Sequence, residues 1–276
     1  MIEQAACDTP GASQFFQHIT PVVLTFNEAP NIGRVLDKLS WANEVVVVDS
    51  GSTDETLAIL RRYPNVRCVH RPFDSHANQW NFAVNLTGIK TDWVLALDAD
   101  YILTESIIRE IADLTPVAHC VGYRASFKYC ILGKPLRAAL YPPVTTLFRR
   151  DGAQYVQDGH TQRVKLNGVI LTLFGVIHHD DRKPLPRWLS AQDRYAVLEA
   201  DLILSKPLGE LRLQDRLRRL IFITPWLVPL YCLTAGRGAL DGSAGVYYAL
   251  QRGVAEAILA LKLLEARLDK RQAPSE

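Results

Sequence analysis

The amino-acid sequence predicts an α/β fold with a mostly parallel sheet. Apolar strand patterns alternate with helical patterns over the first hundred residues, and residues 45–48 are four consecutive valines. Four β-branched residues in a row are typical of a strand buried on both faces of a parallel sheet. Strands that alternate with helices predict a Rossmann-like, doubly wound arrangement. With 276 residues, 48% of them hydrophobic, the chain can form a substantial core.

The predicted elements follow one another closely up to Tyr101. Asp54 and Glu55 favour the start of the second helix, because acidic side chains are stabilised at the positive end of a helix dipole. Beyond Tyr101 the pattern changes to mixed β, and Pro184 and Pro186 mark a break before a long helix. The predicted strands are 22–26, 45–48, 66–69, 93–97, 118–129, 145–149, 162–166 and 169–177. The predicted helices are 31–39, 53–62, 77–86, 188–204 and 244–268.

This pattern predicts an N-terminal extension (1–19), a main domain (20–208) and a C-terminal helical segment (209–276). The apolar run 220–233 in the last part follows four arginines, is interrupted by Pro225 and Pro229, and is shorter than the roughly 20 residues that span a bilayer. Its Trp226 and Tyr231 are of the type that favours a membrane interface. We therefore expect peripheral membrane contact, with arginines on anionic headgroups. The alternative is a helical hairpin that packs on the main domain or on a second copy.

Charge and cysteine content limit the possible functions. The formal net charge is only +2, which argues against a nucleic-acid-binding protein that works by bulk electrostatics. The five cysteines are scattered without zinc-ligand spacing, so we expect reduced thiols. The N-terminus lacks the basic and apolar regions of a secretory signal. These features predict a cytoplasmic protein.

Acidic and amide side chains follow three of the predicted strands. Asp98 and Asp100 come directly after the strand 93–97, and the pairs 27–28 and 49–50 follow the first two strands. Ligands of open α/β sheets bind beyond the carboxyl ends of the strands, so these residues are expected at one edge. Two converging carboxylates can hold Mg²⁺ or Mn²⁺, which then carries substrate phosphates. The alternative is a solvated turn or a helix cap.

The turn after the first strand contains no glycine, so a nucleotide bound at this edge needs a metal ion rather than a glycine-rich cradle. Four motifs stand in the order that is typical of family 2 inverting glycosyltransferases of the GT-A fold, and the chain resembles this family over most of residues 20–265. It most resembles the bacterial branch that includes lipopolysaccharide-core glucosyltransferase-like proteins. The motifs are VVLTFNE (22–28), EVVVVDSGSTDET (44–56), QWNFA (79–83) and LDAD (97–100).

The resemblance implies a GT-A fold and a nucleotide-sugar donor, most often a UDP-sugar. Asp49 would accept a hydrogen bond from the base, with the alternative that it caps the loop that follows its strand. The other candidate donor-binding residues that the resemblance implies are Thr25, Asn27, Glu28, Gln79, Asn81 and Asp98.

The same resemblance implies that Asp98 and Asp100 hold the divalent metal, with His179 completing the metal or diphosphate shell. Relatives often carry Glu where this chain has Tyr101. Arg182 and Lys183 either contact a diphosphate or an anionic acceptor, or form a solvated charge pair.

An inverting transfer also needs a general base, which the family supplies as a carboxylate from the second half of the domain. Many relatives have a His-Glu pair where this chain reads QDGHTQR at 157–163. Asp158 is the nearest carboxylate and His160 the alternative base; a simple turn at 158–159 is the third interpretation.

The sequence thus predicts a transferase that moves a sugar from a UDP-sugar to a cell-envelope glycan or lipid-linked acceptor. We expect the protein at the cytoplasmic face of the inner membrane. The sequence permits a homo-oligomer and does not determine the oligomeric state. One alternative is a catalytically lapsed GT-A module that binds glycans or acts as a scaffold. The other is a sugar-phosphate nucleotidyltransferase, which would normally have a glycine-rich basic loop where this chain has Asn27 and Glu28.

Overall fold

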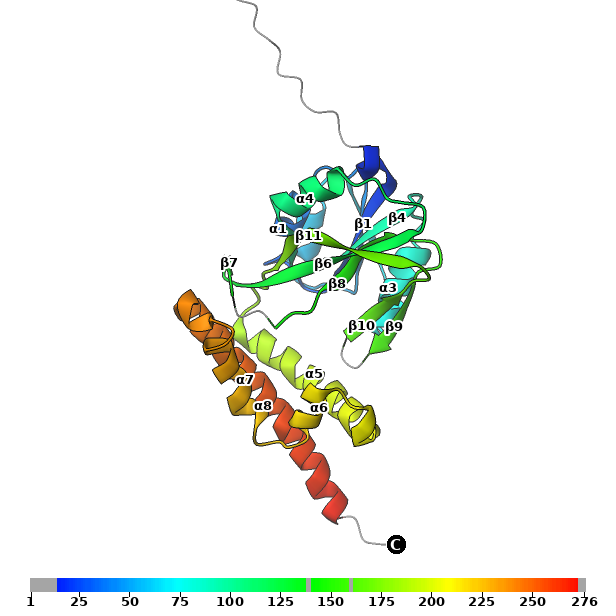
Figure 1. Ribbon diagram of the computed structural model, residues 1–276. Coiled ribbons are helices and arrows are strands. Elements are labelled where there is room, and N and C mark those ends of the chain that lie inside the picture. Colours follow the sequence, from blue (N-terminus) through cyan, green and yellow to red (C-terminus); the bar gives the residue numbers. More distant parts are fainter. Residues whose placement is uncertain (1–13, 138–139, 159–160, 273–276) are drawn as a thin grey trace, which may run out of the picture.

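A nine-stranded sheet forms the centre of the molecule (Figure 1). The computed structural model describes residues 14–137, 140–158 and 161–272. The strand order is β3-β2-β1-β4-β8-β6-β11-β5, with β7 paired to β6, and a separate hairpin consists of β9 and β10. The strands of the first half, β3, β2, β1 and β4, are parallel to one another, whereas β8 is antiparallel to both β4 and β6. The predicted α/β fold with a mixed second half is confirmed.

The elements have the following bounds. The strands are β1 (Ile19–Thr25), β2 (Val45–Asp49), β3 (Val66–His70), β4 (Trp93–Asp98), β5 (Tyr101–Leu103), β6 (Cys120–Ile131), β7 (Lys134–Pro135), β8 (Val144–Arg149), β9 (Gln154–Asp158), β10 (Thr161–Lys165) and β11 (Val169–His179). The helices are η1 (Gln14–His18), α1 (Ile32–Asp37), α2 (Thr56–Leu60), α3 (His76–Asn85), α4 (Glu105–Ala112), α5 (Leu185–Ser205), η2 (Leu208–Glu210), α6 (Leu213–Arg218), α7 (Thr224–Leu233), η3 (Gly238–Asp241) and α8 (Ser243–Gln272).

Both faces of β2 are buried, as the valine run predicts. Successive residues of a strand point to opposite faces. Val45 and Val47 pack in the core that α1 and α4 cover, whereas Val46 and Val48 pack in a second core under α3. All four valines are fully buried. A fully buried aliphatic side chain contributes roughly 1.5–3 kcal/mol to folding, so this strand is strongly specified.

The second half of the sheet curls back toward the first. Only two residues, 99 and 100, separate β4 from β5, yet β5 pairs with β11 at the end of the strand order. This arrangement brings the end of β11 next to the turn at 99–100. The sequence did not predict β5, β9 or α4. The Thr104 side chain caps α4, and Ile107 and Ile111 are four residues apart and buried, so a helical signal was present.

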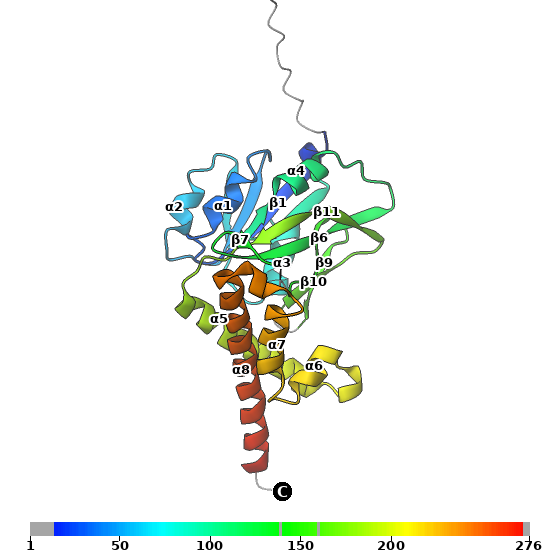
Figure 2. The same cartoon turned by 60° about the vertical axis from the view of Figure 1, so that its left-hand side comes forward.

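The helices after residue 184 form a layer below the sheet, which we call the helical layer and which consists of α5, α6, α7 and α8 (Figure 2). α5 and α8 share a core that includes Ala196, Ile203 and Leu263. Arg218 of α6 binds Glu199 of α5 and Glu256 of α8, at 3.2 and 2.7 Å. The helical layer is tied to the strand region at β7, where the Lys134 ammonium donates to the Asp241 carbonyl oxygen at 2.6 Å.

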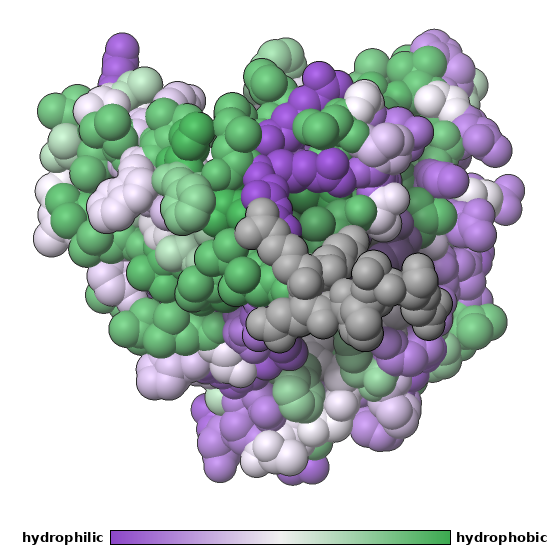
Figure 3. Space-filling model, turned by 90° about the horizontal axis from the view of Figure 1, so that it is seen from below, coloured by the Kyte–Doolittle hydropathy of each residue, from purple (hydrophilic) through white to green (hydrophobic). Residues whose placement is uncertain are grey.

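Many large apolar side chains of the helical layer are exposed. Phe222 and Trp226 are 73% and 78% exposed, and α7 contains no charged residue. Figure 3 views the molecule from the side of these helices and shows apolar side chains over much of that face. In the described part of the chain no helix has both the length and the apolar character needed to span a bilayer. Arg218, expected on lipid headgroups, is instead paired inside the helical layer.

Candidate functional site

The carboxyl ends of β1, β2 and β4 lie side by side at one edge of the sheet, which we call the strand-end site. The pairing register sets Thr25 level with Asp49 and Leu24 level with Asp98. Polar residues from three separate segments of the sequence therefore lie close together. The predicted convergence of these residues is confirmed, and their roles are considered one at a time below.

Asp49 ends β2 and organises the loop that follows it. It is 1% exposed. Its Oδ2 accepts from the backbone N–H groups of Gly51 and Ser52, at 2.8 and 2.9 Å, and its Oδ1 accepts from the hydroxyls of Ser52 and Thr25. A carboxylate has about four acceptor positions, and all four are used here. The observed geometry is that of the loop cap, and the contact with a base stays a prediction.

Asn27 joins the loop after β1 to the loop after β2. Its backbone has a φ of +56°, a left-handed conformation that Asn tolerates better than most residues. Its Oδ1 accepts from the N–H groups of Thr53 and Asp54, at 2.7 and 3.2 Å. The Glu28 N–H donates to the Thr56 hydroxyl at 2.7 Å. The two loops therefore form one rigid unit.

Asp98 and Asp100, which we call the acid pair, lie near the end of β11, where Asp100 contacts His179. His179 Nε2 lies 3.2 Å from Asp100 Oδ2. Asp100 Oδ1 and His179 Nδ1 are both buried and have no hydrogen-bond partner among the described residues. An unpaired buried polar atom is costly, so both atoms are positioned for a partner that the described residues do not supply.

The two carboxylates of the pair differ in pKa. Burial and the neighbouring charge of Asp100 raise the pKa of Asp98 to about 6. Burial opposes ionisation of Asp100 too, but His179 and Lys183 outweigh it and lower the pKa of Asp100 to about 2. Burial likewise opposes the charge of His179, but Asp100 outweighs it and raises the pKa of His179. Asp100 is therefore ionised at neutral pH, and Asp98 takes up a proton in mildly acidic solution.

Tyr101 is a buried member of an aromatic group around His179. Its hydroxyl is hydrogen-bonded to the Tyr141 hydroxyl. The His179 ring packs edge-on against Tyr101, Tyr129 and Tyr141, at centroid distances of 5.3, 4.9 and 5.0 Å. Tyr101 thus helps to fix the orientation of the imidazole by packing.

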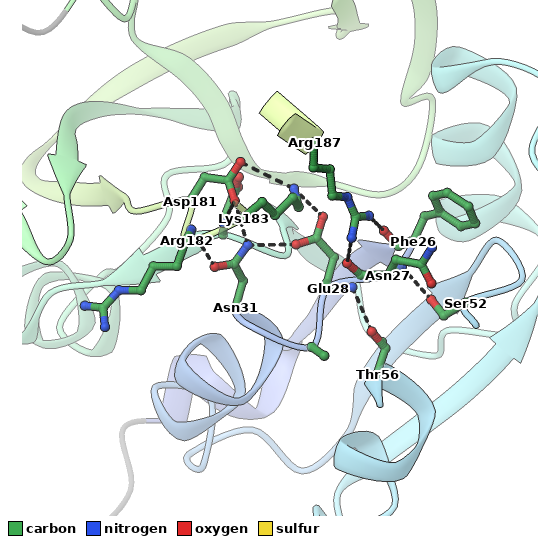
Figure 4. Close-up of polar contacts among 12 residues, drawn as sticks. Phe26, Asn27, Glu28, Asn31, Ser52, Thr56, Asp181, Arg182, Lys183 and Arg187 are labelled. Carbon is green, nitrogen blue, oxygen red and sulfur yellow. Dashed lines mark hydrogen bonds and ion pairs between the residues drawn. The ribbon is translucent and has the colours of Figure 1, made fainter. Parts of the chain in front are cut away.

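Glu28 and Lys183 form an ion pair at the strand-end site (Figure 4). The Lys183 ammonium lies 2.7 Å from Glu28 Oε1 and 3.5 Å from Asp181 Oδ2. Burial raises the pKa of Glu28 to about 7, although Lys183 acts in the opposite direction. Burial disfavours the charge of Lys183, but Asp100, Glu28 and Asp181 outweigh it and raise its pKa. Lys183 therefore keeps its charge among several carboxylates.

Two further residues connect residues 180–187 to the loop after β1. Asn31 is fully buried; its Nδ2 donates to Glu28 Oε2 and Asp181 Oδ1, both at 2.9 Å. The Arg187 guanidinium donates to the carbonyl oxygens of Asn27 and Phe26, at 2.6 and 2.7 Å (Figure 4). Neither residue was identified from the sequence, because their partners are up to 161 positions away.

Gln79 and Asn81 on α3 have different surroundings. Gln79 is 1% exposed, and its Nε2 donates to the Ser50 hydroxyl at 3.0 Å, so it supports the loop after β2. Asn81 Nδ2 donates to the Tyr155 carbonyl at 2.9 Å, and its Oδ1 accepts from the Tyr155 N–H at 2.8 Å. Its observed contact is thus with β9, rather than with the strand-end loops.

The candidate base Asp158 lies at the end of β9. Asp158 is the last residue of β9, where its backbone pairs with Thr161. His160 lies outside the described residues. The choice between Asp158 and His160 as the base stays open.

The donor set of the strand-end site fits a divalent cation that is also bound by substrate phosphates. Within the described residues, no three His, Cys, Asp or Glu side chains are grouped so that they alone could hold a metal ion. Mg²⁺ is commonly bound by one or two carboxylates together with substrate phosphates, so a complete protein cage is not required. The ionised Asp100 with its unpaired Oδ1 is suited to such binding.

Sequence comparison identifies the family of the segment that contains β1, β2 and β4. Residues 21–128 match the sequence model of the family described as "Glycosyl transferase family 2". This segment is a family 2 glycosyltransferase domain. It includes Asp49, Asp98 and Asp100 and ends within β6.

Relatives of this glycosyltransferase domain include "Lipopolysaccharide core biosynthesis glycosyltransferase LpsC" of Rhizobium meliloti, 28% identical over 42% of this chain and 44% of that protein. An "Uncharacterized glycosyltransferase" of Rickettsia felis is 34% identical over 34% of this chain and 33% of that protein. The chain thus spans less than half the length of these relatives. Among solved structures, glucosyl-3-phosphoglycerate synthase from Mycobacterium tuberculosis aligns with a TM-score of 0.46 and 17% identity, over 68% of this chain and 78% of that one.

Proposed function

We propose that this protein is an inverting glycosyltransferase that moves a sugar from a nucleotide-sugar donor to a cell-envelope glycan or a lipid-linked acceptor. The match of residues 21–128 to glycosyltransferase family 2, with three polar strand ends at one edge, carries this proposal. The relationship to LpsC supports an acceptor of the lipopolysaccharide-core type. A UDP-sugar is the proposed donor, because the motifs resemble those of relatives that mostly use UDP-sugars.

In this proposal Asp100 is the principal metal ligand, and Asp98 and His179 complete the protein side of the site. The ionised Asp100 carboxylate and its unpaired Oδ1 support this role. Bound Mg²⁺ or Mn²⁺ would neutralise the charge that develops on the leaving diphosphate. The tyrosines around His179 hold its ring in place by packing, and so keep Nε2 directed at Asp100.

The loop unit of Asn27, Asp49 and Thr25 forms the proposed nucleoside side of the pocket, with Glu28 and Gln79 next to it. Its dense hydrogen bonding means that little order has to be gained on binding, which favours affinity. Asp158, or His160 in its place, is the proposed base that removes the acceptor hydroxyl proton during in-line attack on the anomeric carbon. Asn81 holds β9, which ends at Asp158, through its two bonds to Tyr155.

We further propose that the helical layer makes peripheral contact with the cytoplasmic face of the inner membrane. The exposed apolar side chains of α7 and α8 support this contact: Trp226, Leu230, Leu250 and Leu261 are each more than half exposed. The division into an extension (1–19), a catalytic domain (20–208) and a membrane-associating segment (209–276) is part of the proposal. α5 belongs in sequence to the catalytic part but packs on α8.

A binding screen tests the proposed function. The protein is heated with each of several nucleotide sugars, with and without Mn²⁺, and its melting temperature is measured. A ligand that binds only the folded state raises the melting temperature by mass action. We expect one UDP-sugar to stabilise the protein when metal is present. No shift with any nucleotide sugar would contradict the proposal, and a shift without transfer to any envelope acceptor would favour a lapsed, glycan-binding module. Release of pyrophosphate from a nucleoside triphosphate and a sugar phosphate would favour the nucleotidyltransferase.

A further inference from the structure

We propose that Lys183 is a diphosphate-binding residue, whose ammonium leaves Glu28 and contacts the phosphate oxygens of a nucleoside diphosphate bound at the strand-end site. This inference rests on the proposed function and adds to it a residue outside the matched segment 21–128.

The surroundings of Lys183 first suggest this role. Its side chain is 17% exposed, so it is near the surface of the strand-end site yet mostly shielded from water. Carboxylates from three different segments act on its charge: Glu28, Asp100 and Asp181. The Lys183 ammonium is therefore near Asp100 of the acid pair, although its ion pair is with Glu28. A shielded cation attracts an anion more strongly than one in open water, because the effective dielectric constant is lower.

The many acidic side chains of the strand-end site make a cation there useful for binding an anionic ligand. Glu28, Asp98, Asp100 and Asp181 are all acidic, and a diphosphate adds further negative charge. The neighbouring arginines are held elsewhere. Arg187 donates to two backbone carbonyls, and Arg34 and Arg182 both bind Asp180. Figure 4 shows the Arg182 side chain directed away from Glu28, whereas Lys183 points toward it.

The surrounding contacts allow the ammonium to move while its backbone stays in place. The Lys183 N–H donates to Asp181 Oδ1 at 3.0 Å, and the N–H of Arg182 donates to Asn31 Oδ1, also at 3.0 Å. These bonds fix the main chain, and the flexible four-carbon side chain of lysine can then reorient. An arginine at this position would be limited by its planar, fork-shaped group.

Departure of the ammonium does not leave Glu28 without a partner. Asn31 Nδ2 still donates to Glu28 Oε2 at 2.9 Å. The pKa of Glu28 is raised to about 7 by burial, so the carboxyl can also take up a proton. Removing one member of a buried ion pair is costly when the other member stays charged and unpaired. The hydrogen bond from Asn31 and the uptake of a proton by Glu28 reduce this cost.

The test compares a nucleoside diphosphate with its nucleoside, which lacks the phosphates. Isothermal titration calorimetry with Mn²⁺ present measures UDP and uridine binding to the wild type, to Lys183→Met and to the matched control Arg182→Met. GDP with guanosine and CDP with cytidine are used in the same way if UDP does not bind. We expect Lys183→Met to bind the diphosphate about tenfold to a hundredfold more weakly, with unchanged nucleoside affinity. Arg182→Met should bind both ligands as the wild type does.

Equal weakening of diphosphate and nucleoside binding in Lys183→Met would overturn the inference, because it would indicate a structural role. Unchanged diphosphate binding would overturn it as well. A wild type that binds none of the nucleoside diphosphates overturns the proposed function, and this inference with it. If Lys183→Met does not fold, the double variant Lys183→Met/Glu28→Gln removes the unpaired carboxylate. It is then compared with Glu28→Gln alone by the same two titrations, and equal diphosphate affinity of the two would overturn the inference.

Discussion

His179 Nε2 lies 3.2 Å from Asp100 Oδ2, although the two residues are 79 positions apart in the sequence. Strand pairing produces this contact, because His179 at the end of β11 is level with Tyr101, the first residue of β5. β11, from the second half of the domain, therefore lies next to the acid pair, which follows β4 in the first half. The two groups favour each other's charged forms, since Asp100 raises the pKa of His179 and His179 lowers the pKa of Asp100, and removal of the imidazole therefore has a predictable consequence.

Replacing His179 with Phe should raise the pKa of Asp100. The aromatic ring keeps its packing against the tyrosines, but the imidazole that lowers the pKa of Asp100 to about 2 is lost. Asp100 then begins to take up a proton nearer the ordinary Asp pKa of about 4. The pKa of Asp100 in the metal-free protein, measured by NMR of its carboxyl carbon, should be higher in this variant than in the wild type. The same Asp100 pKa in both proteins would contradict the assignment, and His178→Phe on the same strand is the control.

Arg187→Met should loosen the loop after β1. The guanidinium makes two short hydrogen bonds to the carbonyls of Phe26 and Asn27, next to a residue with a positive φ. Hydrogen bonds to charged groups contribute about 1.5–3 kcal/mol, so we expect the free energy of unfolding in urea to fall by about 2 kcal/mol. Arg194→Met is the matched control on the same helix, because among the described residues Arg194 donates a hydrogen bond to the exposed Ser190 hydroxyl, at 2.9 Å, rather than to the loop after β1. Equal stability of the two variants would show that the Arg187 contacts matter little.

Glu28→Gln should remove a pH dependence of stability. The pKa of Glu28 is about 7 in the folded protein, compared with 4.5 for an ordinary glutamate, so the folded state binds the proton more tightly than the unfolded chain does. Stability from this group is therefore greatest below about pH 4.5 and is lost as the pH rises through about 7. Between pH 5.5 and 8 the wild type should lose about 2 kcal/mol more than Glu28→Gln, from urea unfolding at each pH. Glu265→Gln, on the exposed side of α8, should behave as the wild type; an unchanged slope in Glu28→Gln would refute the prediction.

Vesicle flotation tests the helical layer. We expect the protein to float with vesicles of mixed neutral and anionic lipids, and the double variant Phe222→Ser/Trp226→Ser to stay at the bottom. The two side chains are 73% and 78% exposed, and their apolar area would enter the interface. Phe174→Ser is the control, because Phe174 is 94% exposed on β11, outside the helical layer. If the wild type does not float but elutes as a dimer, the face instead joins two copies.

The first half of the site could be predicted from the sequence, because local signals determine it. The valine run and the strand-helix alternation fix β1, β2 and β4 as parallel neighbours, and parallel strands deliver Asp49 and Asp98 to one edge. The interpretation of Asp49 was less certain from sequence. A carboxylate before Ser-Gly-Ser can cap a loop or bind a ligand, and the cap is the geometry observed.

The second half could not be predicted to the same extent, because its contacts are long-range. Arg187 and Asn31 bind partners 160 and 150 positions away, and no local pattern encodes such pairs. Lys183 was noted from sequence as a possible diphosphate contact, but its ion pair with Glu28 depends on the curl of the sheet. The role of Asp158 depends on the shape of the hairpin end, which strand periodicity does not specify.

Sugar transfer by Asp100→Asn tests the central claim most directly. The variant keeps the size of the side chain but loses the charge of the proposed metal ligand, and Asp113→Asn at the end of α4 is the matched control. Turnover of the stabilising UDP-sugar is measured over a range of Mn²⁺ concentrations. We expect Asp100→Asn to lose at least about a hundredfold in turnover, since loss of one group that stabilises developing charge costs roughly that much. Turnover equal to that of the wild type at every Mn²⁺ concentration would contradict the proposed function of the acid pair.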